Sequence, residues 1–336
     1  MEVYLKLIIV GFLFIIASSL MLMVPTTSSK PATNVSCGGD IVRSAVNYTV
    51  KEAVLLQNDL NITINETVYL AVPQNTTHQK AVLLCFNEKY KLIRDEDGNA
   101  MILTQFEMFP HEKRWINSTF KVTVYSYRIT FSNCYRWPNF TLVKEYTTRT
   151  RYWDTENKTI IKLTKDVVDG ANDPVEVAER IAKWLSSRIE YRVLPIRTGS
   201  DRSLFIKNGR VILIGDCSEV SDVYVTMARI AGLPARVAFG MLLENRSRTF
   251  YWINASQGGS FEQHWGGHAW SQVYIPRWGW VDVELLEGFL PKVGDYSWRH
   301  IVYGFEAKKF AGSAIEEFVL PSFSQLRYVS FTFTGG

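Results

Sequence analysis

The chain has 336 residues, of which 47% are hydrophobic and 21% charged, and its formal net charge is +4. A chain of this length can bury at least one sizeable core, and length alone predicts two domains with additional segments. The composition excludes an intrinsically disordered protein. The mild charge, without a basic tail or a run of like charges, argues against nucleic acid as the partner.

The N-terminus carries an unbroken apolar or small stretch from Leu7 to Val24, preceded by Lys6. A run of this length can span a bilayer as a helix. Ala17, Ser18 and Ser19 could offer a cleavage site, but apolar residues continue beyond them, so we favour an uncleaved signal anchor over a cleaved leader. Because Lys6 marks the cytoplasmic side, we expect a single-pass cell-membrane protein with its C-terminal bulk extracytoplasmic, or a secreted protein if the leader is cleaved.

Asn-X-Ser/Thr triplets, the acceptors of N-linked glycans, are dense in this chain. They begin at Asn34, Asn47, Asn61, Asn65, Asn75, Asn117, Asn139, Asn157, Asn245 and Asn254. Each triplet alone is a weak signal, because chance supplies a few in a chain of this length. Together with the apolar leader, their density predicts an exported glycoprotein.

The cysteines are Cys37, Cys85, Cys134 and Cys217, and their spacing matches no zinc-binding pattern. If Cys217 stays a free thiol, at most one disulfide can form among the other three. Cys85 and Cys134 share one predicted domain and are the favoured pair.

The chain after the leader and a polar linker has the pattern of short strands. The segment from Asn61 to Val72 alternates in polarity, and Asp95-Glu96-Asp97-Gly98-Asn99 predicts a turn between two strands. The alternating oxygens of that turn resemble a calcium loop, but the glycine of an EF-hand comes later than Gly98 does. A hairpin turn is therefore favoured and no metal is expected. We predict an all-β, sandwich-like domain over residues 43–168.

The pattern changes after residue 168. Pro174 opens a predicted helix whose apolar residues recur at helical spacing. A short apolar strand, Val211 to Ile214, leads into Gly215-Asp216-Cys217, where a second helix begins that ends at Gly232. Further strands are predicted at 235–241, 268–275, 280–284 and 326–334.

Five parts follow from these patterns. They are a signal anchor or transmembrane helix (1–25), a linker (26–42), the β-sandwich-like domain (43–168), a domain of mixed helices and strands (169–290) and a C-terminal extension with a terminal strand (291–336).

Cys217 stands where a strand ends and a helix begins. Unpaired backbone N–H groups and the positive end of the helix dipole favour the thiolate there, which is the reactive form of cysteine. The same N–H groups can hold an oxyanion that develops on an attacked carbonyl. The alternative is a buried cysteine that acts as a small hydrophobic residue, so Cys217 alone does not define a site.

A histidine and two acids follow on neighbouring predicted strands. His268 opens its strand on the polar face, from which it could take the proton of the Cys217 thiol and return it to a leaving amine. Asp282 and Glu284 share one face of the next strand, and either could orient the imidazole. Alternation nominates both acids and does not choose between them.

Three blocks of sequence occur in a characteristic order. The first is Gly215-Asp216-Cys217, a helix, and Arg229-Ile230-Ala231-Gly232-Leu233-Pro234-Ala235-Arg236-Val237. The second is His268-Ala269-Trp270, and the third is Gly279-Trp280-Val281. Over about residues 172–288 the chain thus resembles the transglutaminase-like superfamily. The resemblance implies a papain-related α+β core, with N-terminal helices packed on an antiparallel sheet, and a Cys-His-Asp triad that Cys217 and His268 would carry. The mixed domain at 169–290 is therefore predicted to be transglutaminase-like.

The sequence departs from the family pattern at the acid. The family places aspartate four residues after the tryptophan of the Gly-Trp pair, and from Trp280 that position is Glu284. Counting from Trp278 instead gives Asp282, which would restore the aspartate. We favour Glu284, because Gly279-Trp280 fits the block better, and keep Asp282 as the alternative.

These features predict an extracytoplasmic enzyme that transfers acyl groups from peptide or carboxamide bonds through a Cys-His-acid triad. We favour hydrolysis, by a peptidase or amidase, over transamidation, because an exported site meets water. The alternative is a catalytically silent cell-surface binding module, which the glutamate at the acid position favours. No cofactor is expected. The expected partners are a protein or peptide substrate and the membrane, and the sequence does not fix the oligomeric state.

Overall fold

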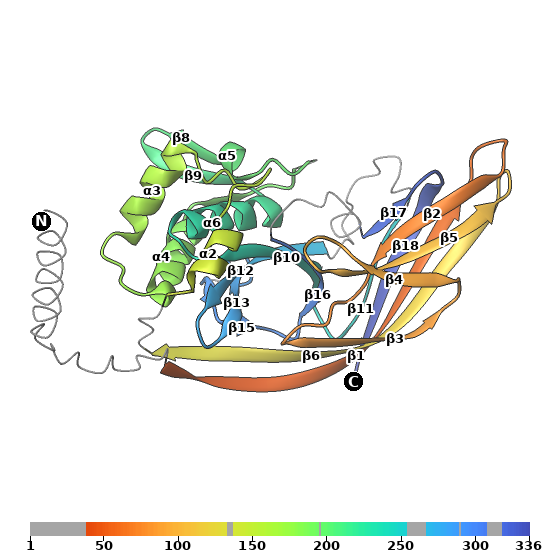
Figure 1. Ribbon diagram of the computed structural model, residues 1–336, viewed down its shortest axis with the longest axis horizontal. Coiled ribbons are helices and arrows are strands. Elements are labelled where there is room, and N and C mark those ends of the chain that lie inside the picture. Colours follow the sequence, from red (N-terminus) through yellow and green to blue (C-terminus); the bar gives the residue numbers. More distant parts are fainter. Residues whose placement is uncertain (1–37, 133–136, 195, 254–266, 289, 308–317) are drawn as a thin grey trace, which may run out of the picture. The chain divides into compact units, whose positions relative to one another are not determined.

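The computed structural model describes residues 38–132, 137–194, 196–253, 267–288, 290–307 and 318–336 (Figure 1). Ser36–Gly336 forms one compact unit. Within the described ranges, no helix is long and apolar enough to cross a bilayer. The predicted anchor at 1–25 lies outside these ranges and stays a prediction.

Six strands make up the first described part of the chain. They are β1 (Gly38–Gln57), β2 (Ile64–Ala71), β3 (Gln79–Phe86), β4 (Tyr90–Arg94), β5 (Ala100–Met108) and β6 (Lys113–Ser132). β1 and β6 pair antiparallel over their whole length. Alternate β1 residues, among them Tyr48, Val50 and Val54, are buried in the same apolar core as Val68 of β2. This period of two is the one that strand side chains obey.

The turn at Asp95–Asn99 joins β4 to β5 and is a hairpin turn, as predicted. Asp95 Oδ1 accepts hydrogen bonds from the backbone N–H groups of Asp97 and Asn99, at 3.0 and 2.8 Å. The carboxylate thus organises its own turn. The Asn99 side chain also exchanges two hydrogen bonds with the backbone of Phe305, each of 2.7 Å. The turn therefore anchors the β-rich part to the C-terminal part of the chain.

Residues 140–168 are largely helical, which corrects the all-β prediction for 43–168. They hold α2 (Phe140–Tyr146) and α3 (Lys158–Val168). The Asn139 side chain accepts from the N–H of Leu142 at 2.9 Å, and the Asn157 side chain accepts from the N–H of Thr159 at 3.0 Å. Asparagine is a strong helix N-cap because its oxygen satisfies an otherwise unpaired N–H of the first turn. Both asparagines also begin glycosylation triplets, so the same residues indicate a helix N-terminus and a candidate glycan acceptor.

The elements around the predicted nucleophile follow. They are α4 (Pro174–Ser186), β7 (Ile189–Tyr191), α5 (Ser200–Ser203), β8 (Leu204–Lys207), β9 (Arg210–Gly215) and α6 (Cys217–Ile230). β9 pairs parallel with β7 and antiparallel with β8. Both predicted helices are present, since α4 begins at Pro174 and α6 begins at Cys217.

A five-stranded antiparallel sheet of order β14-β13-β12-β10-β16 packs against α6. Its strands are β10 (Ala235–Leu242), β12 (Gly267–Ile275), β13 (Gly279–Glu284), β14 (Lys292–Val293) and β16 (His300–Glu306). The α6 side chains of Val223, Met227 and Ala228 are fully buried, which is the apolar stripe that the sequence predicts. The helix-on-sheet core implied by the resemblance is therefore present (Figure 1).

The predicted C-terminal extension, 291–336, is woven into the sheets. Beside β14 and β16 it holds β15 (Asp295–Tyr296), β17 (Val319–Pro321) and β18 (Gln325–Gly335), the predicted last strand. β15 pairs with β6, β17 with β2, and β18 with both β1 and β11 (Ser247–Ile253). The C-terminal residues thus complete sheets that begin at residue 38, and β16 brings His300 into the sheet of the predicted site.

Cys85 is a free, exposed cysteine, which contradicts the favoured pairing with Cys134. Cys85 lies opposite Thr119 of β6, and β6 continues from there as an extended strand to Ser132. An extended strand rises about 3.3 Å per residue, so that stretch spans roughly 40 Å. A disulfide needs Cα atoms within about 7 Å of each other. Cys134 itself lies outside the described residues.

Candidate active site

Cys217 is the first residue of α6 and is partly exposed. The residues around it build a capping box: Asp216 Oδ1 accepts from the N–H of Ser218 at 2.9 Å, and the Glu219 carboxylate accepts from the N–H of Asp216 at 3.1 Å. Gly215 allows the strand to run this close to the helix, because a Cβ at that position would lie 2.3 Å from the Cβ of Glu219. The thiol therefore stands at the positive end of a well-capped helix.

His268 lies between Cys217 and Glu284. Its Nε2 is 2.8 Å from Glu284 Oε2, and its side chain is 8% exposed. The Cys217 side chain is close enough to be among the causes that raise the pKa of the His268 imidazole. Burial lowers the pKa of His268, but the charge of Glu284 and the hydrogen bonds to Cys217 and Glu284 outweigh it and raise the pKa to about 10. The imidazole is therefore held as the cation at neutral pH.

Glu284 is the ionised partner of that cation. Burial raises the pKa of Glu284, yet the charge of His268 and hydrogen bonds from His268 and His300 hold it well below its ordinary value. The second oxygen, Oε1, accepts from the N–H of Leu286 at 2.8 Å. The carboxylate is thus fixed at both oxygens.

Asp282, the alternative acid, is engaged elsewhere. Its Oδ1 accepts from Trp270 Nε1 and from Gln272 Nε2, each at 2.7 Å. Its Oδ2 accepts from the hydroxyl of Tyr127 on β6 at 2.5 Å. These bonds tie β12, β13 and β6 together. Of the two nominated acids, the structure brings Glu284 to His268, while Asp282 joins the sheets.

Two residues of this arrangement were absent from the sequence-based candidates. His300 Nε2 lies 3.2 Å from Glu284 Oε2, and the Tyr127 hydroxyl donates a hydrogen bond to Asp282 Oδ2. His300 begins an apolar strand in the mixed C-terminal segment, and Tyr127 lies on a strand of the other predicted domain. Nothing in the local sequence of either residue indicates the long-range contact.

The metal-binding potential of the site is confined to three side chains. Ligand atoms of His268, Glu284 and His300 lie within 4.8 Å of one another, and the three residues are the one such group that the described ranges contain. Histidine and carboxylate are zinc ligands. Here the 2.8 and 3.2 Å contacts to one carboxylate oxygen are hydrogen bonds, which account for the arrangement without an ion.

The end of β7 and the loop that follows it lie near Cys217. Tyr191 is 57% exposed, and partial burial together with the neighbouring Cys217 raises the pKa of its hydroxyl to about 12. Further along, Arg197 forms a buried ion pair with Asp222 of α6 and another, of 2.6 Å, with Glu306 of β16. These pairs fasten the loop against the helix and the sheet.

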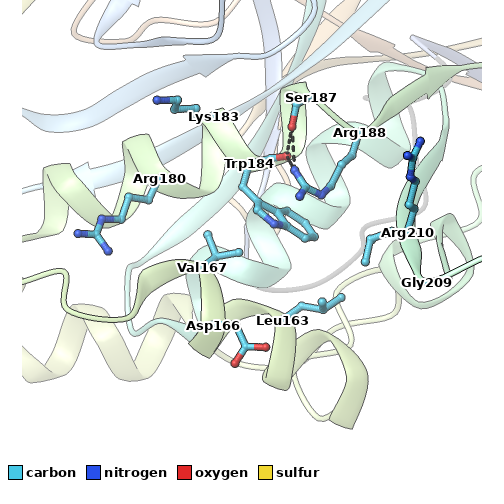
Figure 2. Close-up of a pocket in the computed structure, with 11 residues that line it drawn as sticks. Leu163, Asp166, Val167, Arg180, Lys183, Trp184, Ser187, Arg188, Gly209 and Arg210 are labelled. Carbon is cyan, nitrogen blue, oxygen red and sulfur yellow. Dashed lines mark hydrogen bonds between the residues drawn. The ribbon is translucent and has the colours of Figure 1, made fainter.

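A separate pocket of about 970 Å³ opens between α3, α4 and the start of β9 (Figure 2). The cations that line it are Arg180, Lys183, Arg188 and Arg210. Figure 2 shows the Arg188 guanidinium bonded to the Ser187 hydroxyl and the Trp184 carbonyl oxygen, each at 2.7 Å. Neither Cys217, His268 nor Glu284 lines this pocket, so its shape says nothing about the chemistry at the thiol.

A cysteine that starts a helix packed on an antiparallel sheet, with a buried histidine at its thiol, is the arrangement of the papain-related cysteine enzymes. The comparison with protein families agrees: residues 161–285 match the transglutaminase-like superfamily. The chain therefore carries a transglutaminase-like domain, and the resemblance read from the three sequence blocks is confirmed at the level of the superfamily.

Solved structures and one curated relative are similar to this chain. A crystal structure from Cytophaga hutchinsonii, described as a candidate cysteine protease, has a TM-score of 0.58 at 12% identity, over 88% of this chain and 92% of that one. This likeness shows the fold alone. The periplasmic domain of TgpA from Pseudomonas aeruginosa, bound to ethylmercury, has a TM-score of 0.36 at 13% identity, over 72% of this chain and 90% of that one.

The curated relative is an uncharacterized protein of Haemophilus influenzae. It is 29% identical over 152 residues, which are 43% of this chain and 40% of that protein. The chain thus spans less than half the length of this relative.

Proposed function

We propose that the chain catalyses cysteine-dependent acyl transfer on peptide or carboxamide bonds. Cys217 is the nucleophile, His268 the general base and acid, and Glu284 the triad acid. The observation that carries the proposal is the position of His268, whose Nε2 lies 2.8 Å from Glu284 Oε2 and whose pKa is raised by both Glu284 and Cys217. This is the relation of nucleophile, base and orienting acid that covalent acyl transfer requires.

The reaction begins with attack of the Cys217 sulfur on the substrate carbonyl carbon. Backbone N–H groups at the start of α6 stabilise the oxyanion of the tetrahedral intermediate. The His268 imidazolium then donates a proton to the leaving amine, the carbon–nitrogen bond breaks, and a thioester on Cys217 remains. His268, now neutral, takes a proton from the second nucleophile as that nucleophile attacks the thioester carbonyl. The carbon–sulfur bond then breaks, the acyl product leaves, and the Cys217 thiolate and the His268 imidazolium are restored.

The second nucleophile is water in the favoured version of the proposal. Cys217 is partly exposed and Tyr191, which lies near it, is 57% exposed, so water has access to the thioester. A lysine amine in place of water would give transamidation instead. The protein is then a peptidase or amidase, with transamidation as the competing outcome.

The proposed setting is extracytoplasmic, with the membrane reached through the predicted N-terminal anchor. Surface placement of the glycosylation triplets supports this part. The exposed triplet asparagines are Asn47, Asn61, Asn65, Asn75, Asn117, Asn139 and Asn245. A glycan needs an asparagine on the surface, and these positions meet that requirement.

The catalytically silent alternative drew its support from the glutamate in the acid position. Glu284 reaches His268 with an oxygen at 2.8 Å, so the longer side chain is no obstacle to the triad. The proposal of an enzyme is therefore preferred to that of a binding module.

The test compares the full-length protein with its Cys217→Ala variant on a quenched casein substrate, with and without a fluorescent primary amine. Cleavage that the variant lacks is expected, and it would establish a cysteine hydrolase. Cys217-dependent incorporation of the amine would establish a transamidase. If neither appears and the thiol also resists alkylation, the protein is a binding module.

A further inference from the structure

His300 occupies an unusual place beside the candidate triad. It is 2% exposed and lies at the first residue of β16, two strands away from β12 in the sheet order β14-β13-β12-β10-β16. Its Nε2 nevertheless reaches Glu284 Oε2 at 3.2 Å. This is the oxygen that His268 Nε2 contacts at 2.8 Å, so two buried imidazoles converge on one carboxylate oxygen.

The hydrogen-bond partners of His300 show which of its ring nitrogens donates to Glu284. An ionised carboxylate only accepts hydrogen bonds, so Nε2 of His300 must carry the proton that points to Glu284. The other nitrogen, Nδ1, lies 3.0 Å from the Ser297 hydroxyl. Ser297 can donate its hydroxyl proton to Nδ1 while its oxygen accepts from the N–H of Arg299 at 3.3 Å. Nε2 of His300 therefore donates to Glu284, whichever of Nδ1 and the Ser297 hydroxyl donates in the bond between them.

The space around His300 is built to hold the ring. Trp270 meets it edge-on with ring centroids 4.8 Å apart. Gly240 of β10 leaves room for this crossing, because a Cβ there would lie 3.2 Å from the Trp270 ring and 2.0 Å from the carbonyl oxygen of Ile301. Packed rings in a fixed rotamer can aim a hydrogen bond without further loss of side-chain entropy.

Glutamate rather than aspartate at position 284 agrees with this arrangement. Its carboxylate accepts from His268 and His300 at Oε2 and from the N–H of Leu286 at Oε1. An aspartate is one methylene shorter and would draw the carboxylate back toward β13, away from the two rings. The glutamate that replaces the family's aspartate at position 284 thus occurs together with an additional hydrogen-bond donor, His300.

We propose that His300 is a positioning residue of the triad, which donates a hydrogen bond from Nε2 to Glu284 and holds that carboxylate ionised and aimed at His268. The inference rests on the proposed function, because it assigns a role within the same site. His300 does not touch the thiol or a substrate, and it acts through Glu284.

The charges near Glu284 set the expected consequence. His268 faces it from β12, His300 from β16, and Asp282 shares its face of β13, while Cys217 lies beyond His268. Burial raises the pKa of Glu284, and the hydrogen bond from His300 is one of the contributions, after those of His268, that keep it low. Without that donor, Glu284 takes up a proton at higher pH, and the imidazolium loses its counter-charge as pH falls.

The experiment measures the rate of Cys217 alkylation by iodoacetamide against pH in the full-length protein, with the modified residue identified by mass spectrometry. In His300→Leu, the acid limb of the rate profile is expected to move to higher pH, with a rate on the order of 10-fold lower at the acid end of the wild-type plateau. His300→Gln keeps a side-chain N–H near the position of Nε2 and is expected to stay within about threefold of wild type. An unchanged profile in a folded His300→Leu protein would overturn the proposal.

A matched pair keeps the test decisive if His300→Leu does not fold. His300→Asn is polar like His300→Gln but one methylene shorter, so its amide falls short of Glu284 and its profile is expected to shift. Equal profiles of the Gln and Asn variants would overturn the proposal. The proposed function fails separately, if wild-type Cys217 reacts no faster at mildly acidic pH than free cysteine does.

Discussion

Asp282 and Glu284 stand two residues apart on one face of β13, but they belong to two different regions of the interior. They are 2% and 3% exposed, so burial does not distinguish them. Asp282 lies where β12, β13 and β6 meet and accepts from uncharged donors of Trp270, Gln272 and Tyr127. Glu284 lies at the end of the strand and accepts from two histidines. The two carboxylates are equally buried and share a strand, so neither property decides which of them can orient a histidine. The difference lies in the hydrogen-bond donors that surround each carboxylate.

The largest effect is expected from removal of the proposed base, His268. His268→Ala takes away both the proton acceptor and the cation beside the thiol, so alkylation of Cys217 at mildly acidic pH should slow by on the order of 10²- to 10³-fold. The rate is measured with iodoacetamide, and circular dichroism checks the fold. A variant that reacts like wild type would mean that His268 does not activate the thiol. The contact of Glu284 with His268 would then not distinguish Glu284 from Asp282 in function.

Replacement of the proposed triad acid, Glu284, should have the next largest effect. Glu284→Gln retains the shape of the side chain but removes the charge that holds the His268 cation, so the acyl-transfer rate should fall by on the order of 100-fold. The rate of Cys217-dependent casein cleavage measures it. Asp282→Asn is the matched control, because it makes the same chemical change two residues away.

The pH dependence of stability sharpens the same contrast. An unfolded histidine titrates near about 6.5, whereas in the folded protein the pKa of His268 is about 10, because the charge of Glu284 and the hydrogen bonds to Cys217 and Glu284 outweigh burial. The folded state thus keeps a proton that the unfolded state loses. The free energy of unfolding should therefore fall as pH rises from about 6.5 to about 10.

Glu284→Gln should flatten this decline, because it removes the counter-charge that raises the pKa of His268. Asp282→Asn should preserve it. Urea denaturation at a series of pH values measures the slope. A Glu284→Gln slope equal to that of wild type would show that the pair does not titrate as described.

The smallest effect on chemistry is expected at Asp282. Asp282→Asn leaves His268 untouched, so Cys217 alkylation should stay within about threefold of wild type. The substitution weakens the bonds to Trp270, Gln272 and Tyr127 and should cost about 1–3 kcal/mol of unfolding free energy. Urea denaturation and alkylation of the same preparation separate the two effects. A large loss of reactivity with little loss of stability would give Asp282 the role assigned to Glu284.

The sequence predicted the local parts of this account. The strand-to-helix junction at Cys217 and the turn at Asp95–Asn99 both have short-range signals, and both are present. The helices α2 and α3 were missed although Asn139 and Asn157 cap them, because those asparagines were interpreted as glycosylation signals. The same asparagine can cap a helix and begin a triplet, so the triplet pattern alone does not reveal the cap.

The choice between the two acids was beyond the reach of local sequence. Alternation places Asp282 and Glu284 on one face, and the difference comes from Tyr127 of β6 and His300 of β16. Tyr127 precedes Asp282 by 155 positions, so its contact depends on tertiary packing. The predicted Cys85–Cys134 disulfide was also beyond the reach of local sequence. The prediction assumed a compact set of short strands, but β6 is one long strand that leads away from Cys85.

The most direct test of the account is a rapid-quench measurement of acylation with p-nitrophenyl acetate. Wild type and Asp282→Asn should give a burst of nitrophenol close to one equivalent, with the acetyl group on Cys217 by mass spectrometry, and Glu284→Gln should give a much slower burst. An acetyl group on another residue, or equal bursts in the two carboxylate variants, would contradict it.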